Sequence, residues 1–380
     1  MWVQTLHLDN FRSYKEAHVE FAPGINVLVG SNGQGKTNIV EAVYYLATLN
    51  SHRVASENSL VKSGELSAVI RSKINQDDRA LTIDIEINPG KTNRAKLNRS
   101  PVPRVRDILG IVRVIMFAPE DLALVKGDPN ERRNFMDQTL IQRTPKFMGV
   151  KSDYEKVLRQ RNALLKSSHR ENIDSTLHVW NEQLAQLGAE ITHSRIQFIR
   201  DLTPFICMRY HLISGGEKAV SASEISLTYQ SKYLTEGDLE SLTHNDIKEQ
   251  ILGQLDLRKR EEFVRGVTLV GPHRDELFIR LGVLPLKGYA SHGESWSAAL
   301  ALRVASADVL KADGIEPILI LDDVFAELDV LRRTTILELT QDAPQVFITA
   351  AVESDVPTEI GGARFHISSD SIVAHNGDSL

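Results

Sequence analysis

The sequence is nearly free of cysteine. Cys207 is the only one among 380 residues, so the chain cannot form an internal disulfide or a cysteine-rich metal site. The sequence also lacks an apolar run long enough to span a bilayer, and its first residues lack the basic and apolar regions of a secretion signal. We therefore expect a cytoplasmic protein with no membrane partner.

An excess of positive charge is absent as well. The 44 Lys and Arg residues are outnumbered by 50 Asp and Glu, which gives a net charge of −6 at pH 7. Overall charge thus does not indicate a nucleic-acid binder, and any such binding must use a local basic patch. The length, with 42% hydrophobic and 25% charged residues, is typical of a soluble globular protein of two or three domains.

Residues 30–37 read Gly-Ser-Asn-Gly-Gln-Gly-Lys-Thr and match every fixed position of the phosphate-binding pattern G-x-x-x-x-G-K-[ST]. An apolar run at 25–29 precedes them and helical apolar spacing at 38–49 follows, which favours a nucleotide site over an ordinary glycine-rich turn. The glycines let successive N–H groups turn toward a phosphate, and the helix start adds partial positive charge. We expect Lys36 to reach the β- and γ-phosphates and Thr37 to hold Mg²⁺. The predicted nucleotide contacts are Gly30, Ser31, Asn32, Gly33, Gln34, Gly35, Lys36, Thr37 and Asn38.

A second apolar run, at 318–321, ends in Asp322 and Asp323. Two acids at a strand end are common in turns, but a phosphate loop elsewhere in the chain needs an acidic partner. We expect Asp322 to support Mg²⁺ through its water shell and Asp323 to orient or deprotonate an attacking water.

A second anion site is predicted where Ser291-His-Gly-Glu-Ser295 opens a helical run at 296–310. The phosphate loop and this helix start need not serve the same nucleotide. If they lie at opposite ends of one face, two chains can bury two nucleotides between them, head to tail. The sequence therefore predicts an ATP-dependent homodimer.

The rest of the chain divides into strand-rich and helical parts. Strands are expected at 2–9, 17–29, 67–74, 81–87, 112–117, 225–229, 317–321 and 345–349, and a loop at 214–222. From about 130 to 212 the chain is polar and helical, with its three-four apolar spacing interrupted near Ser194. A packed bundle and a protruding arm both fit this helical pattern.

The order of these motifs resembles that of ABC-type ATPases, and of the RecF family in particular. The resemblance spans residues 1–350 and rests on Phe11-Arg-Ser-Tyr14, Phe117-Ala-Pro-Glu-Asp-Leu122, Val125-Lys-Gly127, Arg132-Arg133, Gly271-Pro-His-Arg-Asp275 and Leu321-Asp-Asp-Val-Phe-Ala-Glu-Leu-Asp329. It implies an α/β fold, an ABC-type ATPase head with a P-loop core and a mixed sheet. We expect this head to comprise residues 1–125 and 260–380, and an inserted, mainly helical lobe to comprise 126–259.

Proteins of this family are similar to the heads of SMC proteins. The resemblance implies ATP-dependent dimerisation, binding to single-stranded or gapped duplex DNA, and slow, DNA-stimulated ATP hydrolysis that acts as a switch. It also implies work with RecO and RecR to load RecA in replication, recombinational repair and SOS induction.

The resemblance also assigns roles to individual residues. It places Ser291 and Gly293 at the γ-phosphate held by the other subunit, Asp329 at the dimer seam, and Arg12 and Arg53 near the nucleotide. Two ordinary surface arginines are the alternative for the last pair.

Several positions depart from the family pattern. The expected glutamine loop offers Glu120, the catalytic position carries the shorter Asp323, and no histidine follows Thr349. The signature also has His292, Glu294 and Ser295 where a glutamine-rich sequence is expected. The shorter Asp323 and the missing histidine are compatible with a slow switch, and the signature changes bear on the contact with the other subunit's nucleotide.

Local basic patches are the remaining signal for DNA. Without an acid among them, the basic residues of 94–106 could hold a DNA backbone, or could belong to a solvated loop; they are Arg94, Lys96, Arg99, Arg104 and Arg106. A second basic series is interrupted by acids and is typical of an exposed helix face; it contains Lys151, Lys156, Arg159, Arg161, Lys166 and Arg170.

Two other functions are considered. An SMC-like, ATP-gated structural clamp on DNA would need long coiled-coil arms with more uninterrupted heptads, or a zinc hook with paired cysteines. The energising subunit of a transporter would need a membrane partner, and no exposed apolar docking surface is visible in the sequence.

Overall fold

The computed structural model describes the chain except for residues 55, 77–78, 168–172, 215–224, 236, 238, 329, 342, 358–359, 369–371 and 376–380. Most of the predicted loop at 214–222 and the predicted seam residue Asp329 therefore lie outside the described residues. The chain falls into two compact units. The first is formed by the described parts of Met1–Leu122, Arg209–Lys218 and Trp296–Leu380, and the second by those of Ala123–Met208 and Ala219–Ser295.

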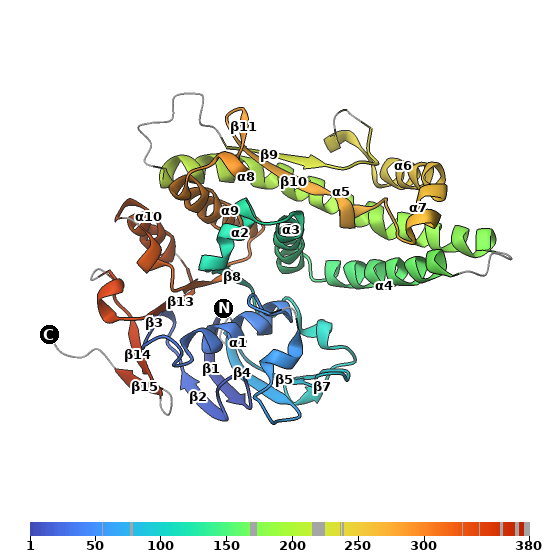
Figure 1. Ribbon diagram of the computed structural model, residues 1–380. Helices are drawn as coiled ribbons and strands as arrows, with labels where there is room; N and C mark the ends of the chain where they lie inside the picture. The colour runs from blue at the N-terminus through green and yellow to red at the C-terminus, as the bar shows by residue number, and fades with distance from the viewer. Residues whose placement is uncertain are drawn as a thin grey trace. The chain divides into compact units, whose positions relative to one another are not determined.

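The first unit contains an antiparallel sheet with the strand order β2-β1-β4-β5-β6-β7 (Figure 1). Its strands β4 and β5 alternate buried and more exposed residues, because one face of the sheet packs on the core, as their period of two predicts. The strands are β1 (Trp2–Asp9), β2 (Glu16–Glu20), β4 (Ala68–Gln76), β5 (Arg79–Ile87), β6 (Arg94–Leu97) and β7 (Ser100–Pro101).

A second sheet of the same unit has the order β15-β14-β3-β13-β12-β8 and is parallel except for β15. Its central strands are continuous apolar runs, since both faces are covered. Its strands are β3 (Gly24–Val29), β8 (Val114–Phe117), β12 (Ile318–Asp322), β13 (Gln345–Ala350), β14 (Ala363–Ile367) and β15 (Ile372–His375). The mixed sheet and P-loop core confirm the predicted fold class.

The strand expected over 17–29 is divided in two. β2 ends at Glu20 and β3 begins at Gly24, with Pro23 between them. Proline has no N–H to donate to a ladder, so the chain leaves one sheet and enters the other here. Asn26 closes this turn, because its amide accepts from Ala22 N at 2.9 Å and donates to Ala22 O at 2.8 Å.

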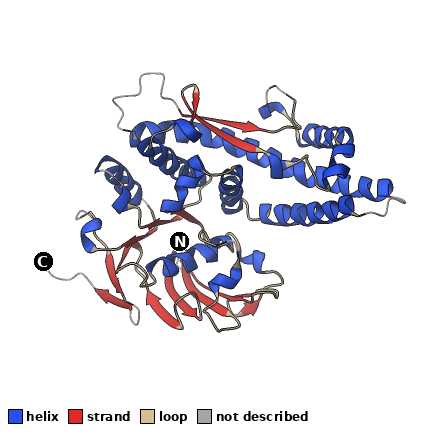
Figure 2. Cartoon of the chain, in the orientation of Figure 1, coloured by secondary structure: helices blue, strands red, loops and turns tan. Residues whose placement is uncertain are grey.

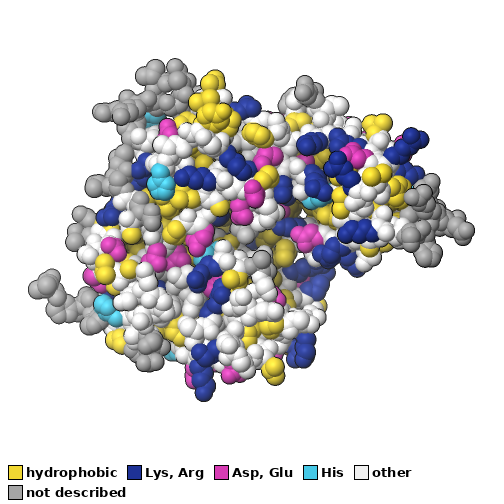
Figure 3. All heavy atoms as spheres, viewed as in Figure 1, with side chains coloured by type: hydrophobic (Ala, Val, Ile, Leu, Met, Phe, Trp, Pro, Cys, Tyr) yellow, Lys and Arg dark blue, Asp and Glu magenta, His cyan; other side chains and the backbone are white. Residues whose placement is uncertain are grey.

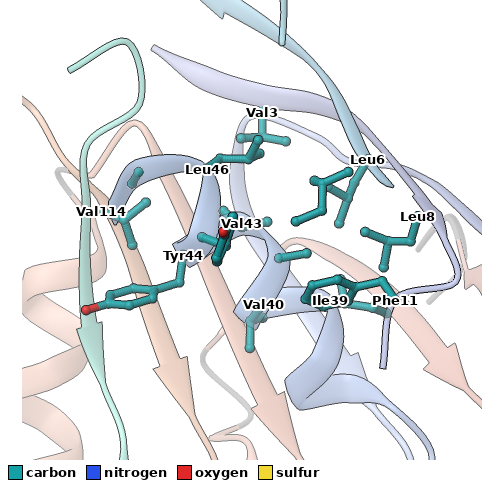
Figure 4. Close-up of a cluster of buried hydrophobic side chains, with 14 of the residues drawn as sticks. Val3, Leu6, Leu8, Phe11, Ile39, Val40, Val43, Tyr44, Leu46 and Val114 are labelled. Atoms are coloured by element: carbon teal, nitrogen blue, oxygen red, sulfur yellow. The ribbon is translucent and has the colours of Figure 1, made fainter. Parts of the chain in front are cut away.

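Helix α1 (Lys36–Thr48) is buried on nearly all sides. It contacts β8, β12 and β13 of the parallel sheet, and its apolar residues share a core with β1. Figure 4 shows Val3 of β1 beside Leu46, and Phe11 beside Ile39. A helix that is apolar all round is stable only in such a sandwich, which fixes the end of the phosphate loop between two sheets.

The two sheets are joined by the buried side chain of Gln345, at the start of β13. Its amide Nε2 donates to Val3 O at 2.9 Å, and its Oε1 accepts from Val3 N at 2.8 Å. The side-chain amide thus satisfies the backbone N–H and C=O of Val3, as a neighbouring strand would. The first unit is completed by α10 (Val330–Gln341) and most of α9 (His292–Ala312).

The second unit is mainly helical (Figure 2). Its small sheet has the order β11-β10-β9, from β9 (Ile225–Gln230), β10 (Glu276–Leu281) and β11 (Leu284–Pro285). Its helices are α2 (Leu122–Lys126), α3 (Pro129–Arg143), α4 (Phe147–Lys166), α5 (Ile173–Ile213), α6 (His244–Leu257), α7 (Lys259–Arg265) and α8 (Leu286–Tyr289), except that Leu122 and the end of α5 from Arg209 belong to the first unit. Short 3₁₀ turns occur in both units. Those of the second unit are Leu239–Ser241 and Pro272–Arg274, and those of the first are Glu57–Leu60, Val105–Ile108, Pro119–Asp121, Phe325–Glu327 and Glu353–Asp355.

The inserted lobe ends later than the sequence predicts. Residues 260–295, expected in the head, belong to the second unit. The reason is strand pairing: β10 forms its antiparallel ladder with β9, from Glu276 opposite Gln230 to Leu281 opposite Ile225. The tertiary structure decides which strand a short strand pairs with, and the local sequence pattern does not show it.

The helices of the second unit are packed together. α5 runs through Ser194 without a break, and at Gly188 it approaches both α4 and α6 closely. A Cβ on Gly188 would lie 3.3 Å from Ile251 and 3.4 Å from Tyr154. This close approach favours the packed lobe over the protruding arm.

Arg161 does not belong to an exposed basic face. Its side chain is fully buried, and its guanidinium donates to Glu262, Thr268 and Asn181 at 2.6–2.8 Å. The part of the predicted series that lies on α4 is therefore interrupted by a core ion pair, and Arg170 lies outside the described residues. Among the described residues, no helix is both long enough and apolar enough to cross a bilayer.

Candidate nucleotide site

The phosphate loop connects β3 to α1 through glycines that other residues could not replace. Gly35 has φ 104°, and a Cβ there would lie 2.4 Å from the Tyr14 hydroxyl. A Cβ on Gly30 would lie 2.2 Å from the carbonyl oxygen of Ile367. Ser31, Asn32 and Gly33 are exposed at the tip of the loop. The loop thus has the positive-φ turns and open backbone that a phosphate cradle requires.

Lys36 lies beneath the loop that it is predicted to serve. Its side chain is buried, and its Nζ donates to Gly30 O at 2.6 Å and to Ser31 O at 3.4 Å. The ammonium group is therefore held by the loop's own carbonyls. A phosphate in the loop would offer this cation a stronger, charged acceptor.

The acidic partner predicted for the loop lies at the end of β12. Asp322 Oδ1 accepts from the Thr37 hydroxyl at 3.1 Å and from the Thr349 hydroxyl at 2.6 Å. Thr349 also accepts from Asp323 N at 2.9 Å. Thr37, Asp322 and Thr349 come from three segments far apart in the sequence, so the fold brings the two predicted metal-binding residues together.

Asp323 has a left-handed backbone, with φ 51°. Asp and Asn tolerate this conformation better than other residues with a Cβ. Burial raises the pKa of the Asp323 carboxyl, the neighbouring Asp322 adds to the increase, and Lys36 acts against it. A carboxyl with a raised pKa is a better proton acceptor for an attacking water than an ordinary aspartate.

The donor set suits Mg²⁺. Thr37 and Asp322 offer a hydroxyl and a carboxylate 3.1 Å apart, and Mg²⁺ prefers oxygen ligands, with few from the protein and the rest from phosphates and water. Among the described residues, no cluster of three or more His, Cys, Asp or Glu could hold a metal ion by itself.

Arg12 has a different contact from the predicted one. Its guanidinium forms a bidentate pair with the buried carboxylate of Glu41 on α1, at 2.6 and 2.8 Å, and donates to Ser59 O at 2.8 Å. Its role at the nucleotide stays a prediction. Arg53 is exposed and donates to the Asn38 side chain at 3.3 Å, so it lies beside the first turn of α1.

Sequence reasoning missed three residues near this site. Thr349 is held against both aspartates, Glu41 binds Arg12, and the His52 ring lies 3.8 Å from Asp322 Oδ2. Glu41 had a signal, because it is a lone acid within an otherwise apolar helical run. Thr349 and His52 had none, since only tertiary structure brings them to Asp322.

The predicted signature lies in the second unit and at the start of α9. Ser291 N donates to Glu294 Oε2 at 2.8 Å, and Glu294 N donates to Ser291 Oγ at 3.2 Å. This reciprocal capping box explains the Ser-x-x-Glu spacing. Gly293 follows in the first turn of the helix.

The predicted glutamine-loop position is exposed at Glu120, while its neighbour Asp121 is engaged. Asp121 accepts from Ala118 N at 3.0 Å and from the Arg303 guanidinium at 2.6 and 3.0 Å. Although burial acts in the opposite direction, Asp121 raises the pKa of Arg303. Asp121 therefore holds the chain at the end of β8, and these contacts give it a structural role.

The Gly271–Asp275 motif forms a buried polar cluster in the second unit. Asp275 Oδ2 accepts from the hydroxyls of Tyr229 and Tyr233 at 2.5 and 2.6 Å, whereas its Oδ1 has no partner in the described part of the chain. Burial raises the pKa of Asp275 to about 6. His273 contacts the Tyr154 hydroxyl at 2.7 Å, and burial lowers the pKa of His273 to about 4.

The first basic patch, except for Arg99, lines a groove of about 1440 Å³ in the first unit. Its basic side chains outnumber its acids, Asp84 and Glu86, and none of its described lining residues is aromatic. On the face drawn in Figure 3, Lys and Arg side chains are interspersed with Asp and Glu. The basic residues that line the groove are Arg71, Lys91, Arg94, Lys96, Arg104 and Arg106.

The fold and the phosphate-loop site together define an ATPase head of the ABC type. The model of the RecF/RecN/SMC N terminal domain matches residues 2–359. A DNA replication and repair protein RecF from Streptomyces avermitilis is 49% identical over 379 residues, which cover 98% of this chain and 99% of the relative. The chain belongs to the RecF family.

Solved structures agree with this assignment. A structure of the recombination mediator protein RecF with ATP, in the RecFOR pathway, has a TM-score of 0.87 at 26% identity, over 99% of this chain and 98% of that one. An Smc head domain from Pyrococcus furiosus has a TM-score of 0.53 at 16% identity, over 98% of this chain and 96% of that one. The second likeness concerns the fold alone.

Proposed function

We propose that the chain is an ATP-dependent DNA-binding protein of DNA replication, recombinational repair and SOS induction. ATP and Mg²⁺ drive it to dimerise on single-stranded or gapped duplex DNA, where it helps to load a recombinase. Slow ATP hydrolysis then releases it. The observation that carries the proposal is the meeting of Thr37 and Asp322 beneath the phosphate loop.

In this proposal, Lys36 would leave the loop carbonyls for the phosphates, while Thr37 and Asp322 would hold Mg²⁺ directly or through water. When bound, Mg²⁺ would supply neutralisation of the phosphate charge. Asp323 orients the attacking water. ATP binding is supported by the RecF structure that contains ATP, to which this chain is similar over nearly its full length.

The dimer rests on two half-sites, the phosphate loop of one chain and the Ser291 helix start of another. A complementation experiment tests it. Lys36→Ala and Ser291→Arg should each abolish ATP-dependent dimerisation when alone. Mixed together, they should dimerise, because one of the two composite sites then joins an intact loop to an intact signature. Failure of the mixture to dimerise, although the parent does, would refute the head-to-tail arrangement.

The loss of a helix cap needs its own control. Thr243 caps α6 in the same unit with a similar box, accepting from Asp246 N at 3.2 Å. Ser291→Ala and Thr243→Ala should each cost about 1 kcal/mol of stability. Only the Ser291 variant should weaken ATP-dependent dimerisation.

DNA binding is assigned to the basic groove of the first unit. Its Lys and Arg side chains suit phosphates, and affinity should fall steeply with salt. Neutralising Arg94, Lys96 and Arg104 to Gln should weaken binding to a gapped duplex at least tenfold and flatten the salt dependence. Neutralising Lys156, Arg159 and Lys166, which are exposed on α4, changes the net charge equally and should have little effect. Equal losses in both triple variants would remove the groove from the proposal.

The partners follow from the same assignment. RecO and RecR are proposed because the similar RecF structure belongs to the RecFOR pathway, with RecA as the recombinase that is loaded. Such a protein acts in the cytoplasm, where the chromosome lies. Sedimentation with and without ATP, gapped DNA and RecR tests dimerisation, DNA binding and partner binding in one series. A sedimentation profile that ATP and DNA leave unchanged would overturn the proposal.

A further inference from the structure

The carboxylate of Asp322 uses its two oxygens differently. Oδ1 accepts from the hydroxyls of Thr37 and Thr349. Oδ2 faces His52, whose Nε2 lies 3.8 Å away, which is too far for a hydrogen bond. One edge of the carboxylate is therefore fixed by hydroxyl groups, and the other edge faces an imidazole ring.

The ring nitrogens of His52 are buried, and they make no hydrogen bond to the described residues. Its side chain is 10% exposed, and its ring packs edge-on against Tyr44 with centroids 5.6 Å apart. Both Nδ1 and Nε2 are unpaired within the part of the chain that the structure describes. A buried donor or acceptor left unpaired is destabilising. Both ring nitrogens can thus donate or accept a hydrogen bond that the described surroundings do not provide.

The position of His52 is fixed by its neighbours. Ser51 Oγ donates to Glu41 Oε1 at 2.5 Å and accepts from Arg53 N and Val54 N at 3.0 and 3.1 Å. Glu41 is itself held by Arg12. The segment that carries His52 is therefore anchored to α1, the helix that begins at the phosphate loop.

We propose that His52 is a positioning residue of the magnesium–nucleotide site. With Mg²⁺ and nucleotide bound, its Nε2 and Asp322 Oδ2, 3.8 Å apart, would together hold a water at the ion. At the position where the family pattern expects a glutamine, Glu120 is exposed and the next residue, Asp121, is paired with Arg303. His52 therefore supplies the polar group beside Asp322 that neither of these two acids supplies. This role rests on the proposed function and adds a residue to the same site.

Three substitutions of His52 test the role through the affinity for a fluorescent ATP analogue, in Mg²⁺ and in EDTA. His52→Phe keeps an aromatic ring against Tyr44 and removes both nitrogens. It should weaken binding in Mg²⁺ about tenfold, the effect of losing 1.4 kcal/mol, and leave binding in EDTA unchanged. His52→Gln, whose amide can reach the Nε2 position, should stay within about twofold of the parent. His52→Asn, which mimics Nδ1, should behave like the Phe variant.

The two conditions and the two amide variants distinguish a polar contact at Nε2 from a steric effect of the ring. Unchanged binding of the Phe variant in Mg²⁺, or an equal loss in EDTA, would overturn the role, and so would rescue by Asn in place of Gln. If the Phe variant does not fold, the comparison of Gln with Asn still decides, because both are polar.

Lys36→Ala, measured alongside, should lose the nucleotide under both conditions. A parent that binds no ATP would refute the proposed function itself. A parent and Phe variant with equal affinity would refute only the role of His52.

Discussion

The Thr37 hydroxyl lies 3.1 Å from Asp322 Oδ1, although the two residues are 285 positions apart in the chain. Thr349 reaches the same oxygen from β13 at 2.6 Å. One carboxylate oxygen of β12 thus accepts hydrogen bonds from both the phosphate-loop helix and β13, so these bonds form only when the three elements are correctly assembled. Substitutions around it should change metal-dependent binding more than overall stability.

Removing the Thr349 hydroxyl tests this link. Thr349→Val keeps the shape but leaves Asp322 without one donor and Asp323 N without its acceptor. We expect a loss of about 1–3 kcal/mol in the free energy of unfolding and weaker ATP binding in Mg²⁺. Thr340→Val is the control, because the Thr340 hydroxyl is also in the first unit but only donates to Leu337 O at 2.7 Å. The same ATP affinity in both variants would contradict the link.

Asp323→Asn should separate nucleotide binding from turnover. Asparagine has nearly the same size and also tolerates the left-handed backbone, with φ 51° at this position. ATP affinity should stay within about twofold, while hydrolysis should fall by a factor of about 10²–10⁴, as expected for the loss of a general base. Single-turnover hydrolysis measures this directly. Turnover at the parent rate would mean that Asp323 is not the catalytic carboxylate.

The Arg12–Glu41 pair should behave as a buried ion pair. Glu41 is fully buried, and Arg12→Ala would leave its carboxylate without its partner. We expect a loss of about 3–5 kcal/mol in unfolding free energy, most of which returns in the double variant Arg12→Met, Glu41→Leu. Urea unfolding of the two single variants and the double variant measures the coupling. If Arg12→Ala keeps its stability but loses ATP affinity, the arginine serves the nucleotide, as the sequence predicts.

Asp275 should make the second unit less stable as the pH rises. Its pKa is raised from 3.8 to about 6, so the fold favours the protonated carboxyl. Its contribution is complete below pH 4 and is lost as the pH rises through 6, about 3 kcal/mol in total. Hydrogen exchange in β9 and β10 should show this loss in the parent and not in Asp275→Asn. A parallel pH dependence in the two proteins would count against it.

Much of the fold could be predicted because it depends on patterns within short stretches of the sequence. The period of two identified β4 and β5, and the glycine loop between apolar runs identified β3 and α1. Asp322 could be found because a phosphate loop needs an acid at the end of a buried strand. In each case a short window holds the whole signal.

What could not be predicted depends on partners chosen by the tertiary structure. Arg161 looks like any surface arginine until Glu262 is placed beside it. His52 follows the end of a helix, where a polar residue is unremarkable, and only the fold brings it to Asp322. The end of the inserted lobe was missed for the same reason, since β10 pairs with β9.

The order of the parallel sheet has a consequence for biosynthesis. β3, which carries the phosphate loop, pairs with β13 and β14, both of which are synthesised long after it. At roughly 5–20 residues per second, the loop waits about 15–60 s on the ribosome for its strand partners. The Gln345 side chain reaches Val3 only at this stage. A nascent chain interrupted before β13 therefore carries the whole phosphate-binding motif without the sheet that would make it a site.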